Sequence, residues 1–84
     1  MTTHHLISVK IGWTEPTDEQ LTTLRDLIND HIGKAWQISN FRINMGYVYA
    51  NVENHLPLAF RERDEAYVQG LIAGYLIAIG CEVI

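Results

Sequence analysis

The sequence predicts one α+β domain over residues 1–84, with its elements in the order β-α-β-β-α-β. Three observations support this prediction. Apolar and polar residues alternate near the N-terminus and in the middle of the chain, two other segments space their apolar residues as helices do, and 84 residues leave room for one core. A domain this small buries only about 60% of its unfolded surface, and oligomerisation is a common supplement to such a core.

Residues 6–13 form the first expected strand. Ile7, Val9 and Ile11 fall on one side of it, which is the period-2 pattern of a strand with one buried face. The segment after it contains Pro16, which lacks the backbone N–H that a ladder needs, so the strand is expected to stop before that point.

The first helix is expected to begin at residues 17–20, which have the form of a capping box. In that motif Thr17 accepts a hydrogen bond from the backbone N–H of Gln20. Gly33 supplies a left-handed stop at the other end. The apolar residues that recur at helical spacing between them are Leu21, Leu24, Leu27, Ile28 and Ile32.

The strand pattern returns between residues 35 and 54. Phe41, Ile43 and Met45 alternate with polar residues, and a second alternating run follows Gly46. Two antiparallel strands are therefore predicted, with their turn at residues 44–46 or, alternatively, at residues 39–40. Residues 55–60 are expected to form a loop with apolar side chains over one edge of the core.

The second helix is expected to start with charges at residues 61–64 and to end at Gly80, and residues 81–84 leave room for a short last strand. Residues 66–81 contain no charged side chain, but a bilayer span needs about 20 residues, so no membrane contact is expected. One side of this helix is a normal core stripe of Val68, Leu71, Ile72, Tyr75, Leu76 and Ile79. The opposite side carries Ala66, Gly70, Ala73, Gly74 and Ile77.

This element order is typical of the ferredoxin-like arrangement, a four-stranded antiparallel sheet with two helices on one face. That architecture supports many unrelated functions, so the fold alone does not select one. The formal net charge of −4 argues against general binding of phosphate backbones. The single cysteine, Cys81, suits a reducing compartment, and the first ten residues lack a signal-peptide pattern, so a cytoplasmic location is expected.

The rear of the second helix is the first candidate contact surface. We define the helix rear as Gly70, Ala73, Gly74 and Ile77. A helix that faces water would normally carry charged side chains there, and each interior glycine costs about 1 kcal/mol relative to alanine. Contiguous exposed apolar surface usually marks an interaction site. The sequence thus predicts a non-enzymatic protein-interaction module. It would either form a homodimer or act as a regulator or inhibitor by occluding the surface of a larger protein. The alternative for the two glycines is that they are buried within the monomer.

The open face of the sheet is the second candidate surface. We define the sheet face as Lys10, Arg42, Tyr47 and Tyr49, which the strand alternation places opposite the helices. Residues 45–52 (MGYVYANV) resemble the aromatic octamer of RNA-recognition motifs, with Met45 at its basic position and Val52 at its last aromatic position. The resemblance implies stacking of single-stranded nucleic acid on the tyrosines. Protein contact at the same face is the other interpretation, because tyrosine is enriched at interfaces.

Metal binding and catalysis have little support in the sequence. The four histidines lie at positions 4, 5, 31 and 55, in no ligand spacing known for metal sites, and no second cysteine accompanies Cys81. Phosphate-binding, dinucleotide-binding and nucleophile-elbow motifs are absent from the sequence. The chain is therefore expected to need no cofactor or metal and not to be an enzyme.

Overall fold

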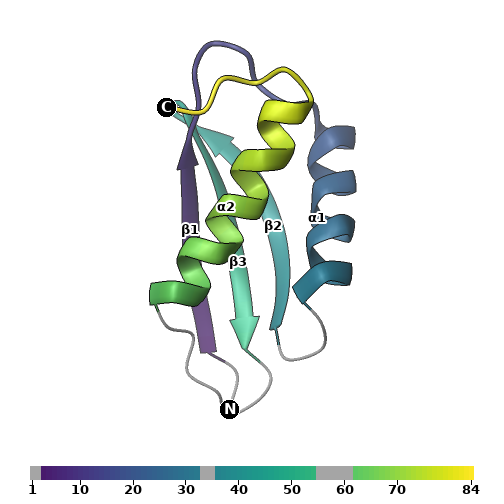
Figure 1. Cartoon of the computed structure of the whole chain (residues 1–84), viewed down its shortest axis with the longest axis vertical. Helices are drawn as coiled ribbons and strands as arrows, with labels where there is room; N and C mark the ends of the chain where they lie inside the picture. Colours follow the sequence, from purple (N-terminus) through teal and green to yellow (C-terminus); the bar gives the residue numbers. More distant parts are fainter. Residues whose placement is uncertain (1–2, 33–35, 55–61) are drawn as a thin grey trace.

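A computed structural model describes residues 3–32, 36–54 and 62–84 of the chain. It places two helices over one face of a sheet and leaves the other face open (Figure 1). The elements, in chain order, are β1 (Thr3–Lys10), α1 (Asp18–Ile32), β2 (Trp36–Asn44), β3 (Tyr47–Asn54) and α2 (Glu62–Ala78). The loop expected at 55–60, the expected helix stop at Gly33 and the first expected residue of the second helix, Arg61, lie outside the described residues.

The sheet has three strands in the order β1-β3-β2, with both pairs antiparallel. The prediction of a four-stranded ferredoxin-like sheet in the order β-α-β-β-α-β was therefore wrong, since the order is β-α-β-β-α. Among the described residues, the one strand-type pairing of residues 81–84 is an isolated bridge between Ile11, just after β1, and Val83. Backbone bonds from Gly12 N to Glu82 O (2.8 Å) and from Ile84 N to Lys10 O (3.0 Å) flank that bridge. One bridge does not make a ladder, so this segment is not a strand.

The turn between β2 and β3 lies at Met45 and Gly46, as the first of the two alternatives predicted. Both residues have positive φ, 49° and 81°, which is the type I′ pattern that matches the twist of a hairpin. The second alternative, residues 39–40, is instead a bulge in β2: the register shifts between Ser39 and Arg42, and Asn40 has φ 55°. Because Met45 occupies the turn, its side chain is exposed rather than on the buried side of a strand.

The core lies between the sheet and the two helices. The expected inward residues of β1 and of the following turn, Ile7, Val9 and Ile11, are all buried, as are the central residues of the stripe on α2. Leu27 differs from the prediction, because helical spacing placed it with the core of α1 but it is 52% exposed. The buried side chains are Ile7, Val9, Ile11, Leu21, Leu24, Ile28, Ile38, Val48, Ala50, Val52, Val68, Ile72, Leu76 and Cys81.

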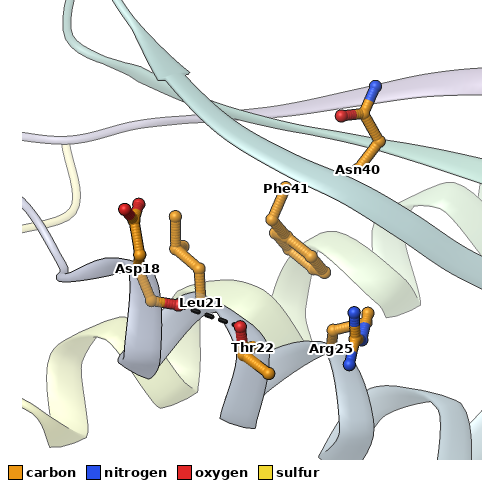
Figure 2. Close-up of a pocket in the computed structure, with 6 residues that line it drawn as sticks. All are labelled: Asp18, Leu21, Thr22, Arg25, Asn40 and Phe41. Carbon is orange, nitrogen blue, oxygen red and sulfur yellow. Dashed lines mark hydrogen bonds between the residues drawn. The ribbon is translucent and has the colours of Figure 1, made fainter.

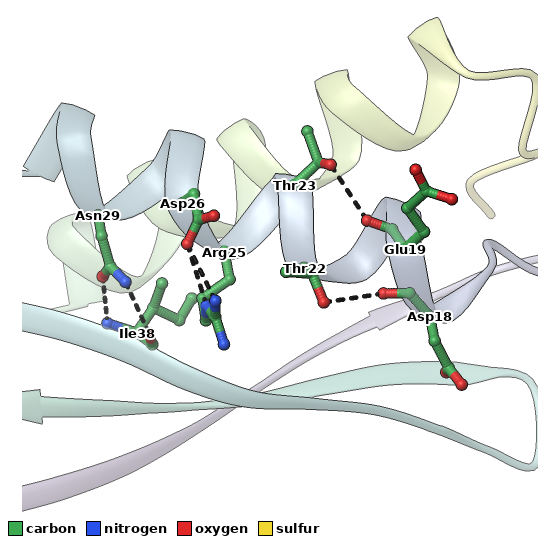
Figure 3. Close-up of polar contacts among 8 residues, drawn as sticks. All are labelled: Asp18, Glu19, Thr22, Thr23, Arg25, Asp26, Asn29 and Ile38. Atoms are coloured by element: carbon green, nitrogen blue, oxygen red, sulfur yellow. Dashed lines mark hydrogen bonds and ion pairs between the residues drawn. The ribbon is translucent and has the colours of Figure 1, made fainter.

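The N-terminus of α1 is held by the expected capping box. Gln20 N donates to Thr17 Oγ1 at 3.1 Å, and Thr17 N donates to Gln20 Oε1 at 2.8 Å, so two backbone donors are satisfied reciprocally. One turn further on, the hydroxyls of Thr22 and Thr23 donate to the carbonyls of Asp18 and Glu19 (Figure 3). This end of α1 is therefore fixed by local bonds.

Each helix is also tied to an outer edge of the sheet by an amide side chain. Asn29 on α1 accepts from Ile38 N at 2.7 Å and donates to Ile38 O at 3.0 Å, so it satisfies two backbone groups of the edge strand β2 (Figure 3). Gln69 on α2 donates to Ser8 O at 3.1 Å on the edge strand β1. These contacts place α1 beside β2 and α2 beside β1, which agrees with Figure 1.

Candidate interaction surfaces

Strand pairing brings the four residues of the sheet face together. Lys10 lies opposite Tyr47 across the β1–β3 pair, and Arg42 lies opposite Tyr49 across the β2–β3 pair. Val48, which alternates with the tyrosines along β3, is buried against the helices, so both tyrosines point to the open face. Residues from three strands separated by up to 39 positions in the sequence thus form one continuous patch on the side of the sheet that no helix covers.

The tyrosines and Arg42 form one connected group. The rings of Tyr47 and Tyr49 lie with their centroids 5.9 Å apart and their planes at 33°. The guanidinium carbon of Arg42 lies 5.7 Å from the centroid of the Tyr49 ring, within the range of a cation–π contact. Its Nη1 donates to Asn40 O at 2.9 Å and to Asn51 Oδ1 at 3.2 Å. These bonds fix the guanidinium beside the ring before any ligand is present.

The bulge in β2 is what positions Arg42. The positive φ of Asn40 turns its carbonyl toward the arginine two residues later, and that carbonyl accepts the shorter of the two guanidinium bonds. Neither Asn40 nor Asn51 was singled out by the sequence. An asparagine is among the few residues that enter the left-handed region readily, so Asn40 offered a weak signal for the bulge.

The two cations of the sheet face lie at the same end of the strands. Its end near the β2–β3 turn carries the cations Lys10 and Arg42 and, beside Gly12, the carboxylate of Glu82, while Glu53 lies opposite Gln37 at the other end of β3. Among the described residues, Lys10 takes part in no salt bridge. This local excess of positive charge occurs in a chain whose formal net charge is −4.

Three of the four residues of the helix rear are open to solvent, and the fourth, Ala73, packs against the core. Gly70, Gly74 and Ile77 are exposed, Ile77 with 62% of its surface accessible, and Ala73 is half-buried. A Cβ atom built on either glycine would meet no other atom within 4 Å among the described residues. Among the described residues the two glycines are therefore not needed for close packing, which favours the intermolecular interpretation of the sequence over the internal one.

The two surfaces do not meet. Both helices lie on one side of the sheet (Figure 1), the sheet face is on the other side, and the core lies between the sheet and the helices. Gln69 adjoins Gly70, and its bond to Ser8 O places this flank of α2 beside the outer edge of β1. Leu6, on the same strand, is exposed on the open face instead, where it lines a hollow with Arg42 and Tyr49. The exposed strand edge and the helix rear are thus neighbours, which the sequence did not indicate.

A hollow between α1 and β2 is a feature that the sequence did not predict. Figure 2 shows it, lined by Asp18, Leu21, Thr22, Arg25, Asn40 and Phe41. Two of its polar side chains are engaged by neighbours: Arg25 donates from Nε and Nη2 to Asp26 Oδ1, at 3.2 Å and 3.1 Å, and Thr22 donates to the carbonyl of Asp18. The side chain of Asn40 points away from the helix. The polar side chains that line this hollow do not converge on one point.

The histidines, cysteine and carboxylates of the described part of the chain are not gathered in one cluster. No group of three or more histidine, cysteine or carboxylate side chains there is placed to hold a metal ion. Cys81 is buried in the core, and the ring of His31 stacks against that of Tyr67 with centroids 6.0 Å apart. Neither helix, over the residues described, is long and apolar enough to cross a membrane.

Comparisons with known proteins do not assign the chain to a family. No family model matches it, and neither the curated proteins nor the solved structures include a significant match. The function must therefore be argued from the two surfaces themselves.

Proposed function

We propose that this protein is a small non-enzymatic interaction module that self-associates through the helix rear. One observation carries the proposal: an uncharged helix surface with two glycines and Ile77 lies open, and no described residue would come within 4 Å of a Cβ built on either glycine. Exposed contiguous apolar surface is unfavourable in water and usually marks a contact site. A module of this kind acts as a regulator or inhibitor by occupying a surface, so we place it in that class rather than among enzymes.

A second copy of the chain is the occupant that this surface fits best. Helices pack with their axes 8–10 Å apart, and small residues at the contact favour the lower end of that range. Gly70 and Gly74 lie one turn apart, so two such flanks related by a two-fold axis would present the same shallow groove to each other. The flank carries no charge that would select a partner of opposite sign. Shape and composition therefore favour self-association over a charged foreign partner.

The test is the molar mass of the protein in solution, measured by light scattering at protein concentrations up to about 1 mM. At that concentration half of the chains are dimeric even if the binding free energy is only about −4 kcal/mol. We expect the mass to rise toward that of a dimer for the wild type and to stay monomeric for Gly74→Glu, which places a charge in the contact. Leu27→Glu is the matched control, because it adds the same charge to another exposed apolar position of the helical layer.

Two results would contradict the proposal. A wild type that stays monomeric up to the highest concentration would show that the helix rear does not bind a second copy. A dimer that Leu27→Glu disrupts and Gly74→Glu leaves intact would place the contact on the other side of the helical layer. Circular dichroism of both variants establishes that each is folded before its mass is interpreted.

A further inference from the structure

We infer that the sheet face binds single-stranded nucleic acid, with two successive bases stacked on Tyr47 and Tyr49 and the phosphates contacted by Lys10 and Arg42. This inference is independent of the self-association proposed above, because the core separates the two surfaces. It rests on the observed placement of aromatic rings, cations and amide side chains on one uncovered side of the sheet.

The two rings provide the stacking platform. They lie side by side along β3 with centroids 5.9 Å apart, and the half-buried state of both residues leaves part of each ring accessible. Bases of a single strand are free to splay apart and stack on such rings, whereas the bases of a duplex are already stacked on one another. The platform is therefore selective for single strands.

The cations lie on either side of the rings. Lys10 is on the neighbouring strand opposite Tyr47, and Arg42 is on the other neighbouring strand opposite Tyr49. Arg42 is held by Asn51 and by the carbonyl of Asn40, and both bonds use Nη1, so among the described residues Nη2 and Nε have no partner. A guanidinium fixed in this way has two donors directed to a phosphate and a planar surface on which a base can stack.

Charge complementarity favours a polyanion over a protein at this face. The chain is acidic, yet this end of the open face has two cations against one carboxylate, that of Glu82 beside Gly12, and the carboxylate of Glu53 lies at the far end of β3. Asn44 lies opposite Tyr47 on β2, where its amide has both a donor and an acceptor for a base edge. A small site of this kind, with two stacked bases and two phosphate contacts, predicts weak and salt-dependent binding.

The experiment is fluorescence anisotropy with labelled 12-nucleotide RNA and DNA single strands of mixed sequence, and with the corresponding duplex. We expect the single strands to bind at low salt and the duplex to bind more weakly. For two phosphate contacts the slope of log K against log salt is about −1.4, and Lys10→Gln is expected to reduce it to about −0.7.

The ring variants test the stacking itself. Tyr49→Leu keeps an apolar side chain of similar bulk but removes the ring, and we expect it to weaken binding by between about 5-fold and about 150-fold. Tyr49→Phe retains the ring and is expected to bind within about 2-fold of the wild type. Tyr67→Leu is the matched control, since Tyr67 is an exposed tyrosine on α2, away from the sheet face.

Three outcomes would overturn the inference. The first is the absence of any single-strand binding at low salt. The second is an equal loss of binding in Tyr49→Leu and Tyr67→Leu, which would indicate contact that does not depend on this face. The third is a change of molar mass in Tyr49→Leu with no change in oligonucleotide binding, which would assign the face to protein contact. Thermal unfolding of each variant separates a binding defect from a folding defect.

Discussion

Replacing both glycines of the helix rear with alanine should stabilise the isolated monomer. Gly70 and Gly74 are interior residues of α2, where glycine is less favourable than alanine by about 0.8–1.0 kcal/mol each. The new Cβ atoms would meet nothing within 4 Å among the described residues, so no steric cost offsets the gain. The double variant is therefore expected to gain about 2 kcal/mol in the free energy of unfolding.

The assay is thermal and urea unfolding, followed by circular dichroism at a concentration where light scattering finds only monomer. For a domain of this size, 1 kcal/mol shifts the melting temperature by about 4–8 °C, so the double variant should melt about 8–16 °C higher. The single variants should each give about half of that shift, because the two positions point to solvent and share no partner.

Gly80→Ala is the matched control and should have the opposite sign. A Cβ atom there would also meet nothing within 4 Å, but the residue has φ 95°, which L side chains rarely adopt. We expect it to lose about 1 kcal/mol or more. A double variant that melts at or below the wild-type temperature while monomeric would refute the reasoning, because it would mean that the helix rear is packed against some part of the chain.

Two further predictions concern the contacts that hold α1. Asn29→Leu should lower the free energy of unfolding by about 2–4 kcal/mol in a urea titration, because it leaves the backbone N–H and C=O of Ile38 without their side-chain partner. A melting temperature within about 2–3 °C of the wild type would contradict this. Thr17→Ala removes the side-chain half of the capping box and should cost about 1 kcal/mol, measured as a drop of about 4–8 °C, whereas Thr17→Ser, which keeps the hydroxyl, should lose much less.

The elements with regular local patterns were predicted from the sequence because their signals lie within a few residues. The capping box at Thr17, the buried alternation of Ile7 and Val9 and the turn at Gly46 are all confirmed. The last strand was not, because four residues contain too little pattern to tell a paired strand from a single bridge. Leu27 was assigned to the core because helical spacing fixes the side of a helix but not how far the neighbouring elements extend over it.

The candidate surfaces were also predicted from the sequence only in part. Alternation along each strand assigned Lys10, Arg42, Tyr47 and Tyr49 to one face, and the strand register then showed which of them are neighbours. The bulge at Asn40 was not predictable in its effect, because the bond from Arg42 to its carbonyl depends on a backbone turn in three dimensions. The hollow beside Arg25 lies between the consecutive elements α1 and β2, and it depends on how the helix packs against the strand.

By itself the sequence determined the helices, the hairpin and the side of each element that faces the core, because apolar periodicity and caps act over one or two turns of chain. Only the tertiary structure decided the number of strands, the solvent exposure of Gly70 and Gly74, and the hydrogen bond from Gln69 to the edge strand β1. The physical reason is that strand pairing and solvent exposure depend on contacts with segments that are distant in the sequence. A local pattern of side chains does not specify which distant segments make those contacts.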